Sequence, residues 1–418
     1  MSELIIQGGK RLEGELHITG SKNAILPIMA ATLLCKDVTY LYNCPKISDV
    51  ELMIEILREL GCKVIWDEKV LIIDTSTLRS CDVPINLVKE MRSSIILLGA
   101  ILGGYKEAKI GLPGGCQLGK RPIDIHLNAL REMQVEITEQ EDFIQCKTSN
   151  LQGANIHLRF PSVGATENIM LVAACAKGTT TIYNAAREPE IVDLQNFLNR
   201  CGAKVFGAGS KTITIQGVEK LQGTHYRVIP DRIIAGTYLV AGAITRGNII
   251  LNDVNCRDLM SVTNRLKAIG CAVRSEENRV ILTVAKQLKG VNLTTAIHPG
   301  FPTDMQSQFM ALLTTCQGIS HINEKIFESR FKTAYELCKM GAKISVNEEK
   351  CKATIYPVPC LQGSAVGATD LRGGAALVIA GLVAEGTTIV SDVHHIKRGY
   401  ADIVSDLSSL GASIEERK

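Results

Sequence analysis

Apolar residues recur along the chain at the spacing of amphipathic helices, and several of these runs end at a glycine followed by a strand-like segment. In "LQNFLNRCGAKV" four apolar residues share one helical face: Leu194, Phe197, Leu198 and Cys201. Such a stripe predicts a helix with one buried face. Glycine suits the left-handed position that closes a helix, so Gly202 predicts where this helix ends.

The same pattern returns at intervals of about 70 residues. The six positions where the helices stop are Gly61, Gln134, Gly202, Gly270, Gly341 and Gly411, separated by 73, 68, 68, 71 and 70 residues. Self-similarity at a fixed period is typical of a repeated structural unit. Gln134 lacks the conformational freedom of glycine, so we expect the second of these helices to end differently.

Each unit also contains an earlier helix that is apolar on nearly every side, as in "SVGATENIMLVAACAKG" and "DLRGGAALVIAGLVAEG". A helix without a polar face is buried all round. Strand-like segments such as "GNIILNDV" follow these helices. The pattern therefore predicts an α/β protein of six repeats, each with a strand, a buried helix, a strand, an outer helix and further strands.

A coarser symmetry relates the two halves of the chain. The stretch "IIQGGKRLEGELHITGSK" resembles "TIQGVEKLQGTHYRVIPDR", and the matched residues lie 209 positions apart: Gln7 and Gln216, Gly8 and Gly217, Leu12 and Leu221, Gly14 and Gly223. We interpret this as two domains of three repeats, residues 22–229 and residues 1–21 with 230–418. A single core would be unusually large for 418 residues.

Composition and charge exclude several classes of protein. With 46 basic and 43 acidic residues the net charge is +3, and there is one tryptophan. Neither number favours nucleic acid or a membrane surface as a partner. The longest apolar run, "SSIILLGAILGG", is too short to span a bilayer, and we expect no signal peptide. The fourteen cysteines form no C-x-x-C pair, so we expect mostly buried thiols in a reducing cytoplasm rather than zinc sites.

Unusual residues gather where the buried helices begin. Four of these residues are cations: Lys22, Arg92, Arg232 and Arg372. The helix macrodipole disfavours positive charge at an N-terminus, so the pattern is explained if an anion binds there. For Ser162, Asp231 and Asp304, which also stand at helix starts, N-capping is the simpler alternative.

The loop "LPGGCQLGKRP" places Cys116 between glycines and the cations Lys120 and Arg121. An exposed thiol beside cations is in the setting that lowers a cysteine's pKa and makes it reactive. The chain has no P-loop, and no G-x-G-x-x-G follows a strand into a helix, so nucleotide hydrolysis and dinucleotide binding are not indicated.

Several of these stretches together resemble the family of UDP-N-acetylglucosamine 1-carboxyvinyltransferases, the UDP-N-acetylglucosamine enolpyruvyl transferases. The resemblance runs end to end and is carried by "GSKNAILPI", "LPGGCQLGKRPIDIH", "PSVGATENIM", "NAAREPEI", "PDRIIAGTYL", "PGFPTDMQSQ", "DLRGGAALV" and "HIKRGY". It implies two inside-out α/β domains, with helices inside and sheets outside. It also implies transfer of the enolpyruvyl group of phosphoenolpyruvate to the 3-hydroxyl of UDP-N-acetylglucosamine, the first committed step of bacterial peptidoglycan synthesis.

The resemblance assigns roles to matched positions. Cys116 is implied as the general acid toward the methylene carbon and as the residue that fosfomycin alkylates. Asp304 is implied as the general base near the sugar hydroxyl. The anions of phosphoenolpyruvate and the tetrahedral adduct are assigned to Lys22, Asn23, Arg92, Arg121, Arg372 and Arg398. The uridine and diphosphate are assigned to Arg121, Pro122, Ile123, Asp124, Ile125, Ser162, Val163, Gly164 and Ile326. No cofactor, metal or obligate protein partner is implied.

Two other functions remain open from the sequence. The enolpyruvyl transferase of the shikimate pathway shares the sixfold architecture but lacks the cysteine loop. A catalytically silent, anion-binding regulator is disfavoured because Lys22, Cys116, Asp304, Arg372 and Arg398 are all retained. The chain departs from the family pattern at Ile234, Lys325, Ser329, Lys397 and Ala401. These departures put substrate affinity in question rather than the reaction, and they fit the second copy that some Gram-positive bacteria carry.

Overall fold

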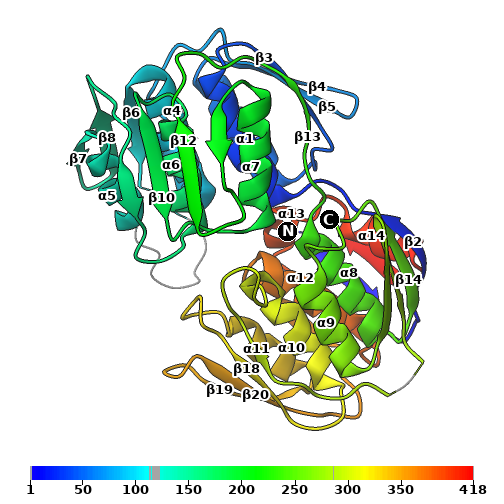
Figure 1. Cartoon of the computed structure of the whole chain (residues 1–418). Helices are drawn as coiled ribbons and strands as arrows, with labels where there is room; N and C mark the ends of the chain where they lie inside the picture. Colours follow the sequence, from blue (N-terminus) through cyan, green and yellow to red (C-terminus); the bar gives the residue numbers. More distant parts are fainter. Residues whose placement is uncertain (1, 113, 115–122, 286, 418) are drawn as a thin grey trace. The chain divides into compact units, whose positions relative to one another are not determined.

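The computed structural model describes residues 2–112, 114, 123–285 and 287–417. Contacts between residues divide them into two compact units (Figure 1). Unit 1 consists of residues 2–19 and 230–417. Unit 2 consists of the described residues between 20 and 229. Each unit contains three copies of one motif of alternating strands and helices.

Unit 2 is built from repeats one to three. The first contains α1 (Lys22–Ala31), β3 (Val38–Tyr42), α2 (Ser48–Glu59), β4 (Lys63–Asp67) and β5 (Val70–Asp74). The second contains α3 (Ile85–Glu90), α4 (Ile96–Tyr105), β6 (Glu107–Gly111), α5 (Asp124–Glu132), β7 (Glu136–Glu139) and β8 (Phe143–Lys147). The third contains β9 (Asn155–His157), α6 (Val163–Ala173), β10 (Thr179–Tyr183), α7 (Pro189–Arg200), β11 (Lys204–Phe206) and β12 (Thr212–Gln216), followed by β13 (His225–Arg227).

Unit 1 is built from repeats four to six. The fourth contains β2 (Glu13–His17), α8 (Arg232–Ile244), β14 (Asn248–Asn252), α9 (Met260–Ile269), β15 (Ala272–Glu276) and β16 (Arg279–Thr283). The fifth contains β17 (Leu293–Thr294), α10 (Gln306–Thr314), β18 (Ser320–Asn323), α11 (Lys332–Lys339), β19 (Lys343–Asn347) and β20 (Lys352–Tyr356). The sixth contains β21 (Ala365–Gly367), α12 (Leu371–Gly381), β22 (Thr387–Ser391), α13 (His394–Lys397), α14 (Ile403–Ser409), β23 (Ser413–Arg417) and β1 (Glu3–Gln7).

Each repeat forms its own sheet. Over the described residues, five of these sheets have four strands in one common order, and the sheet of the second repeat has three, in the order β6-β8-β7. In the third repeat the order is β9-β10-β12-β11, where β9 is parallel to β10 and the other neighbours are antiparallel. The other four-stranded sheets have the orders β13-β3-β5-β4, β2-β14-β16-β15, β17-β18-β20-β19 and β21-β22-β1-β23. In the second repeat, a parallel bridge between Asp82 and Lys109 stands where the edge strand would be.

Three strands pair outside their place in the sequence. β1 opens the chain but lies in the sheet of the sixth repeat, and β2 pairs with β14 of the fourth. β13 follows the third repeat but pairs with β3 of the first. The link from β1 to β2 therefore has the same structural role as the link from β12 to β13, and these are the two stretches that match at an offset of 209 residues.

Close packing explains two of the matched glycines. A Cβ on Gly8 would lie 2.2 Å from the carbonyl oxygen of Ala384, and one on Gly217 would lie 1.7 Å from that of Ala176. The leucines of the same links, Leu12 and Leu221, are fully buried. The repeated sequence therefore reflects a repeated close approach of backbone to backbone.

The two predicted kinds of helix are confirmed. All residues of α4 from Ile96 to Gly103 and of α12 from Arg372 to Gly381 are buried. In α7, by contrast, Leu194, Phe197 and Leu198 are buried, whereas Asn196, Asn199 and Arg200 are exposed. In each unit the fully buried helices pack against one another, α1, α4 and α6 in unit 2 and α8, α10 and α12 in unit 1. The sheets lie outside them, so the inside-out α/β arrangement is confirmed.

Gln134 ends its helix in the same way as the five glycines, so the expectation of a different ending was wrong. Its φ is +63°, and φ at the glycines ranges from +85° at Gly341 to +118° at Gly270. The Val135 amide donates to Leu130 O at 3.1 Å, as the Ala203 amide donates to Leu198 O at 3.0 Å. The backbone hydrogen bonds therefore impose the left-handed conformation on a residue that does not favour it.

Gln134→Gly is expected to raise the free energy of unfolding by about 0.5–1 kcal/mol, because glycine adopts a positive φ without strain but is more flexible in the unfolded chain. Urea unfolding followed by circular dichroism measures the change. The matched control is Gly202→Ala, at φ +102° with nothing within 4 Å of the added Cβ, which should lose about 1 kcal/mol. A destabilised Gln134→Gly would show that the glutamine side chain outweighs the backbone strain.

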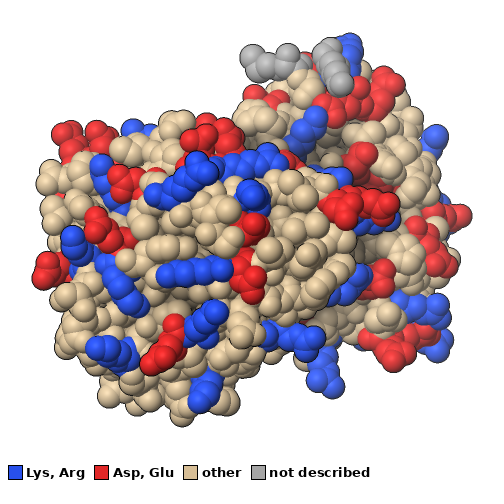
Figure 2. Space-filling view, turned by 90° about the horizontal axis from the view of Figure 1, so that it is seen from above, with Lys and Arg blue, Asp and Glu red and all other residues tan. Residues whose placement is uncertain are grey.

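Basic and acidic side chains are intermingled over most of the face shown in Figure 2. Within the described ranges, no helix has both the length and the apolar character needed to cross a membrane.

Candidate active site

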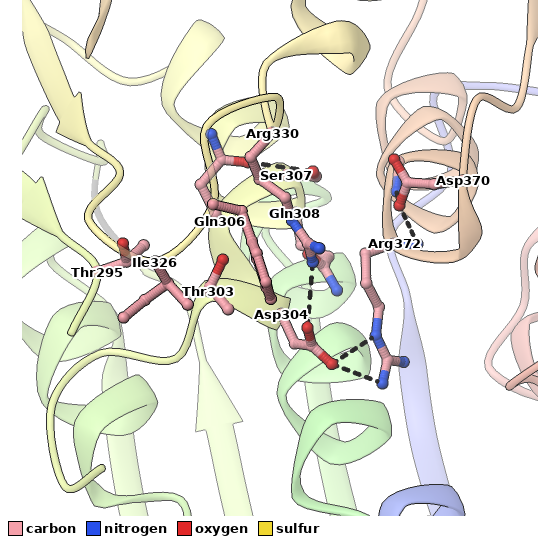
Figure 3. A network of polar contacts seen from close by, with 12 residues as sticks. Thr295, Thr303, Asp304, Gln306, Ser307, Gln308, Ile326, Arg330, Asp370 and Arg372 are labelled. Carbon is pink, nitrogen blue, oxygen red and sulfur yellow. Dashed lines mark hydrogen bonds and ion pairs between the residues drawn. The ribbon is translucent and has the colours of Figure 1, made fainter. Parts of the chain in front are cut away.

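Asp304 lies between two buried arginines of unit 1. Its carboxylate accepts hydrogen bonds from Arg372 Nε at 3.2 Å and Nη2 at 3.1 Å, and from Arg330 Nη2 at 3.1 Å. The side chains of Arg372 and Arg330 are 4% and 2% exposed, whereas that of Asp304 is 27% exposed. Figure 3 shows the two guanidinium groups on either side of the carboxylate. Asp304 is therefore the most exposed side chain of the three.

Three helix starts bring these residues together. Asp304 belongs to the short 3-10 helix Thr303–Met305, which continues into α10. Arg372 is the second residue of α12, and Arg330 precedes the start of α11 by two positions. Because α10, α11 and α12 all contact one another, their N-terminal ends meet. Packing of the helices, rather than nearness in sequence, creates the cluster.

N-capping was the simpler alternative for Ser162, Asp231 and Asp304, and the structure shows which of the three cap a helix. Ser162 Oγ accepts the Ala165 amide, and Asp231 Oδ1 accepts the amides of Ile233 and Ile234. Capping is thus confirmed for Ser162 and Asp231. It is wrong for Asp304, whose carboxylate caps no helix and bonds to the arginines instead.

Ion pairing sets the charge of the cluster. Burial alone would raise the pKa of Asp304, but the positive charges of Arg372 and Arg330 outweigh burial and hold this pKa below its ordinary value. Burial would lower the pKa of Arg372, and the negative charge of Asp304 reverses that effect. Asp304 is therefore an anion at neutral pH, and its proton affinity depends on how strongly the two arginines bind it.

Tyr400 supports Arg372 from the C-terminal segment. The guanidinium carbon of Arg372 lies 5.9 Å from the centroid of the Tyr400 ring. The Tyr400 hydroxyl lies 2.8 Å from Thr237 Oγ1, and the tyrosine is 2% exposed. Arg398 stands two residues earlier, at the end of α13. Arg372 therefore packs on the same C-terminal turn that carries Arg398.

Ile326 lies in the turn that follows β18, where its amide donates to Glu324 Oε1 at 2.8 Å. Figure 3 shows Ile326 near Thr295 and Thr303, and Thr303 is the neighbour of Asp304 in the chain. The structure thus places this predicted substrate contact and the predicted general base in one part of unit 1.

The positions that depart from the family pattern lie in the core or at the surface. Ile234 is 5% exposed in the first turn of α8. Lys397 Nζ pairs with Glu416 at 2.6 Å on the surface. The remaining three residues are exposed: Lys325, Ser329 and Ala401. None of the five replaces a member of the Asp304 cluster.

In unit 2 the predicted anion-binding residues also stand at helix starts. Lys22 opens α1, and its Nζ lies 2.6 Å from Asp49 Oδ2, with both side chains buried. Asn23 follows Lys22, and Arg92 opens the short 3-10 helix Arg92–Ile95. Lys22, like Arg372, therefore has a carboxylate partner within the protein, which the sequence analysis missed.

Asn168 and His126 connect the start of α6, which includes the predicted site residues 162–164, to the start of α4. Asn168 Nδ2 donates to Ile95 O at 3.0 Å and lies 2.8 Å from His126 Nδ1, and its Oδ1 accepts the Gly99 amide at 2.7 Å. A Cβ on Gly164 would lie 3.2 Å from His126 Cε1. Both polar residues were missed. The available signal was an asparagine inside a helix that is otherwise apolar on all sides.

Ile123 to Ile125 lie at the start of α5. Asp124 opens this helix, and its Oδ2 pairs with Arg159 Nη2 at 2.5 Å. The predicted site residues Cys116, Arg121 and Pro122 lie outside the described residues. Among the residues that are described, no three His, Cys, Asp or Glu side chains gather as metal ligands would.

His126 is expected to make the fold less stable as the pH falls from about 6.5 to about 4. Burial lowers the pKa of His126 to about 4, and the charge of Arg92 acts in the same direction while Asp124 opposes it. The unfolded chain therefore takes up the proton first, at a pKa of about 6.5, and unfolding is favoured in this range by up to about 3 kcal/mol.

Urea unfolding at several pH values tests this prediction. His126→Gln, which keeps an acceptor for Asn168, should lose most of the dependence, whereas the exposed His17→Gln should retain it. An unchanged slope in His126→Gln would assign the effect to other groups.

Comparison with known proteins places the chain in a family. The family model for EPSP synthase (3-phosphoshikimate 1-carboxyvinyltransferase) matches residues 6–407. The chain is 48% identical over 415 residues to UDP-N-acetylglucosamine 1-carboxyvinyltransferase 2 of Caldanaerobacter subterraneus subsp. tengcongensis, covering 99% of each chain. It is 47% identical over 417 residues to UDP-N-acetylglucosamine 1-carboxyvinyltransferase of Thermotoga maritima, again covering 99% of each.

Solved structures agree with this placement. The enolpyruvyl transferase NikO from Streptomyces tendae superposes with a TM-score of 0.89 at 26% identity, covering 99% of this chain and 98% of that one. EPSP synthase from Acinetobacter baumannii shares the fold, with a TM-score of 0.77 at 19% identity and full coverage of both chains. The chain therefore belongs to the enolpyruvyl transferase family, and within it to the UDP-N-acetylglucosamine 1-carboxyvinyltransferases.

Proposed function

We propose that this chain transfers the enolpyruvyl group of phosphoenolpyruvate to the 3-hydroxyl of UDP-N-acetylglucosamine and releases phosphate. The observation that carries the proposal is identity of 45–48% to relatives of that name over nearly the whole chain. The Asp304 cluster supports it, because a partly exposed carboxylate beside two buried guanidinium groups suits a reaction of an anionic substrate with a hydroxyl.

The reaction is an addition followed by an elimination. The sugar oxygen bonds to C2 of phosphoenolpyruvate while its proton leaves, and a proton adds to the methylene carbon. The tetrahedral adduct then loses phosphate from C2 and a proton from the new methyl group, which restores the double bond. The first step needs one proton acceptor and one proton donor, and the second step needs stabilisation of the leaving phosphate.

We assign these tasks to the residues that the family resemblance indicated. Asp304 accepts the hydroxyl proton and Cys116 donates to the methylene carbon. Lys22, Arg121 and Arg398 bind the phosphate, and Arg372 binds the carboxylate. Asn23 contacts the adduct, and Arg92 lines the anion site. The contacts to the UDP moiety are assigned to 121–125, 162–164 and Ile326.

The ion pairs of Asp304 bear directly on its role as a base. A carboxylate bound by two arginines holds protons poorly. In this scheme the carboxylate of phosphoenolpyruvate binds Arg372 and partly neutralises its charge, so Asp304 becomes a better proton acceptor when the substrate is present. Arg372 thereby links recognition of one substrate to activation of the other.

Phosphate release from phosphoenolpyruvate, measured with and without UDP-N-acetylglucosamine, tests the proposed activity. Release should require the UDP-sugar, and the product should be its enolpyruvyl ether by mass. Release with shikimate 3-phosphate instead would favour the shikimate-pathway reaction. If no phosphate is released with either acceptor, the result would favour a catalytically silent, anion-binding regulator.

We further place this activity in the cytoplasm, at the first committed step of peptidoglycan synthesis, and thus in cell-wall biogenesis, cell shape and division. The proposed partners are phosphoenolpyruvate and UDP-N-acetylglucosamine, without nucleic acid or membrane. Cys116 would make the enzyme a target of fosfomycin.

A further inference from the structure

Glu324 is a buried carboxylate that the proposed reaction does not use. It follows β18 directly and is 3% exposed. Four hydrogen bonds converge on its two oxygens, from Thr295 Oγ1 at 2.7 Å, Thr303 Oγ1 at 3.0 Å, the Ile326 amide at 2.8 Å and the Phe327 amide at 3.2 Å. A buried carboxylate is costly unless donors satisfy it, so this arrangement has a defined geometry.

The four donors come from three segments, two of which have different proposed roles. Oε1 holds the turn at Ile326 and Phe327, where we assign a contact to the UDP-sugar. Oε2 accepts the hydroxyl of Thr303, which immediately precedes Asp304. Thr295 Oγ1 donates to Glu324 and also accepts the Lys325 amide at 2.9 Å, which fixes the same turn from its other side.

We propose that Glu324 is a positioning residue that fixes the turn at Ile326 relative to Asp304, so that the bound sugar hydroxyl meets the proton acceptor. The proposal rests on the proposed function for the roles of Ile326 and Asp304. The hydrogen bonds predict separable effects, because Oε1 serves the substrate-binding turn and Oε2 serves the segment that carries the base. Cutting the bond to Thr303 should impair the chemical step, and removing the charge of Glu324 should impair both binding and chemistry.

Two variants separate these effects. Thr303→Val removes one hydroxyl at nearly constant volume and should lower kcat about 10-fold, with Kd for UDP-N-acetylglucosamine within about two-fold, because small misplacements of reacting groups are costly. Glu324→Gln should lower kcat and also raise that Kd, each by about 10-fold, because a neutral acceptor binds backbone amides less strongly. Kd is measured by isothermal titration calorimetry and kcat by phosphate release.

Two controls distinguish positioning from folding. Thr303→Ser keeps the hydroxyl and should retain both constants within about two-fold. Thr354→Val removes a hydroxyl that lies 3.1 Å from His321 Nδ1 on the sheet of the same repeat, and it should leave both constants unchanged. Full turnover by Thr303→Val, or equal losses in Thr303→Val and Thr303→Ser, would overturn the proposal.

Hydrogen exchange tests the same link without catalysis. In Glu324→Gln, the amides of Ile326 and Phe327 and the peptide containing Asp304 should all exchange faster than in the parent protein. Unchanged exchange in the Asp304 peptide would overturn the link even in an active enzyme. If the parent protein releases no phosphate, the proposed function is contradicted. Hydrogen exchange would still test whether Glu324 links the turn at Ile326 to the Asp304 segment.

Discussion

Asp304→Asn is expected to bind UDP-N-acetylglucosamine but to turn over at least about 100-fold more slowly than the parent protein. Asparagine has nearly the same shape and can still accept a hydrogen bond, but it cannot take up the hydroxyl proton, an effect typically worth about 10²–10⁴-fold. Calorimetry gives the affinity for the UDP-sugar and phosphate release gives kcat. Near-normal turnover would reject Asp304 as the base.

The same substitution should also destabilise the fold. It leaves Arg330 and Arg372 buried beside each other without the carboxylate that both bind, and loss of one partner from a buried ion pair costs about 3–5 kcal/mol. The matched control is Asp402→Asn in the same unit, because Asp402 caps α14 through the Ser405 amide and asparagine caps as well. A loss in Asp304→Asn no larger than that control would contradict the ion-pair cluster.

The stability difference between the parent protein and Asp304→Asn should depend on pH. Because the arginines hold the pKa of Asp304 below its ordinary value, the ion pairs stabilise the fold fully above pH about 4–5 and less as the pH falls further. Denaturation at pH 7 and pH 3 should therefore give a larger difference at pH 7.

Cys116→Ser is expected to lose activity by at least about 100-fold, because a hydroxyl is far too weak an acid to protonate the methylene carbon. Cys116→Asp should keep part of the activity with an optimum at lower pH, because a carboxyl group can carry the proton but holds it only in more acidic solution. Steady-state phosphate release between pH 5 and pH 9 compares the two variants with the parent. Full turnover by Cys116→Ala would remove this residue from the mechanism.

Fosfomycin provides a second measurement on the same variants. The parent should be alkylated and inactivated, and both variants should resist. Among the described cysteines, burial raises the pKa of Cys44, Cys62, Cys146, Cys271 and Cys316 to about 12, so these thiols react poorly. Peptide mapping should therefore find the adduct at Cys116, with the exposed Cys338 as an internal control. An adduct mainly at Cys338 would contradict an activated Cys116.

The six repeats and the two kinds of helix were predictable because they depend on local patterns. An apolar stripe sets which side of α7 is buried, and a helix without polar residues such as α4 is buried all round. Glycine correctly predicted five of the six helix ends. The remaining end, at Gln134 in the second repeat, was mispredicted. Hydrogen bonds to Arg131 O and Leu130 O set the backbone at Gln134, whatever its side chain prefers.

The exchange of strands between repeats was not predictable from local patterns. β1, β2 and β13 have ordinary strand sequences, and nothing in them specifies a partner far along the chain. The 209-residue match showed that the two links are alike, but only strand pairing showed that both carry the chain from the last sheet of a unit to its first.

The sequence by itself predicted the residue types of the site: a cysteine loop with nearby cations, further cations at helix starts, and Asp304 after a proline-rich approach. Only the tertiary structure decided that Asp304 pairs with Arg330 and Arg372, which lie 26 and 68 positions away, rather than capping α10. An aspartate before a helix has the same local sequence in both roles. The choice depends on which buried charges the packed helices bring to it, because a buried guanidinium group requires a carboxylate more strongly than a helix end requires a cap.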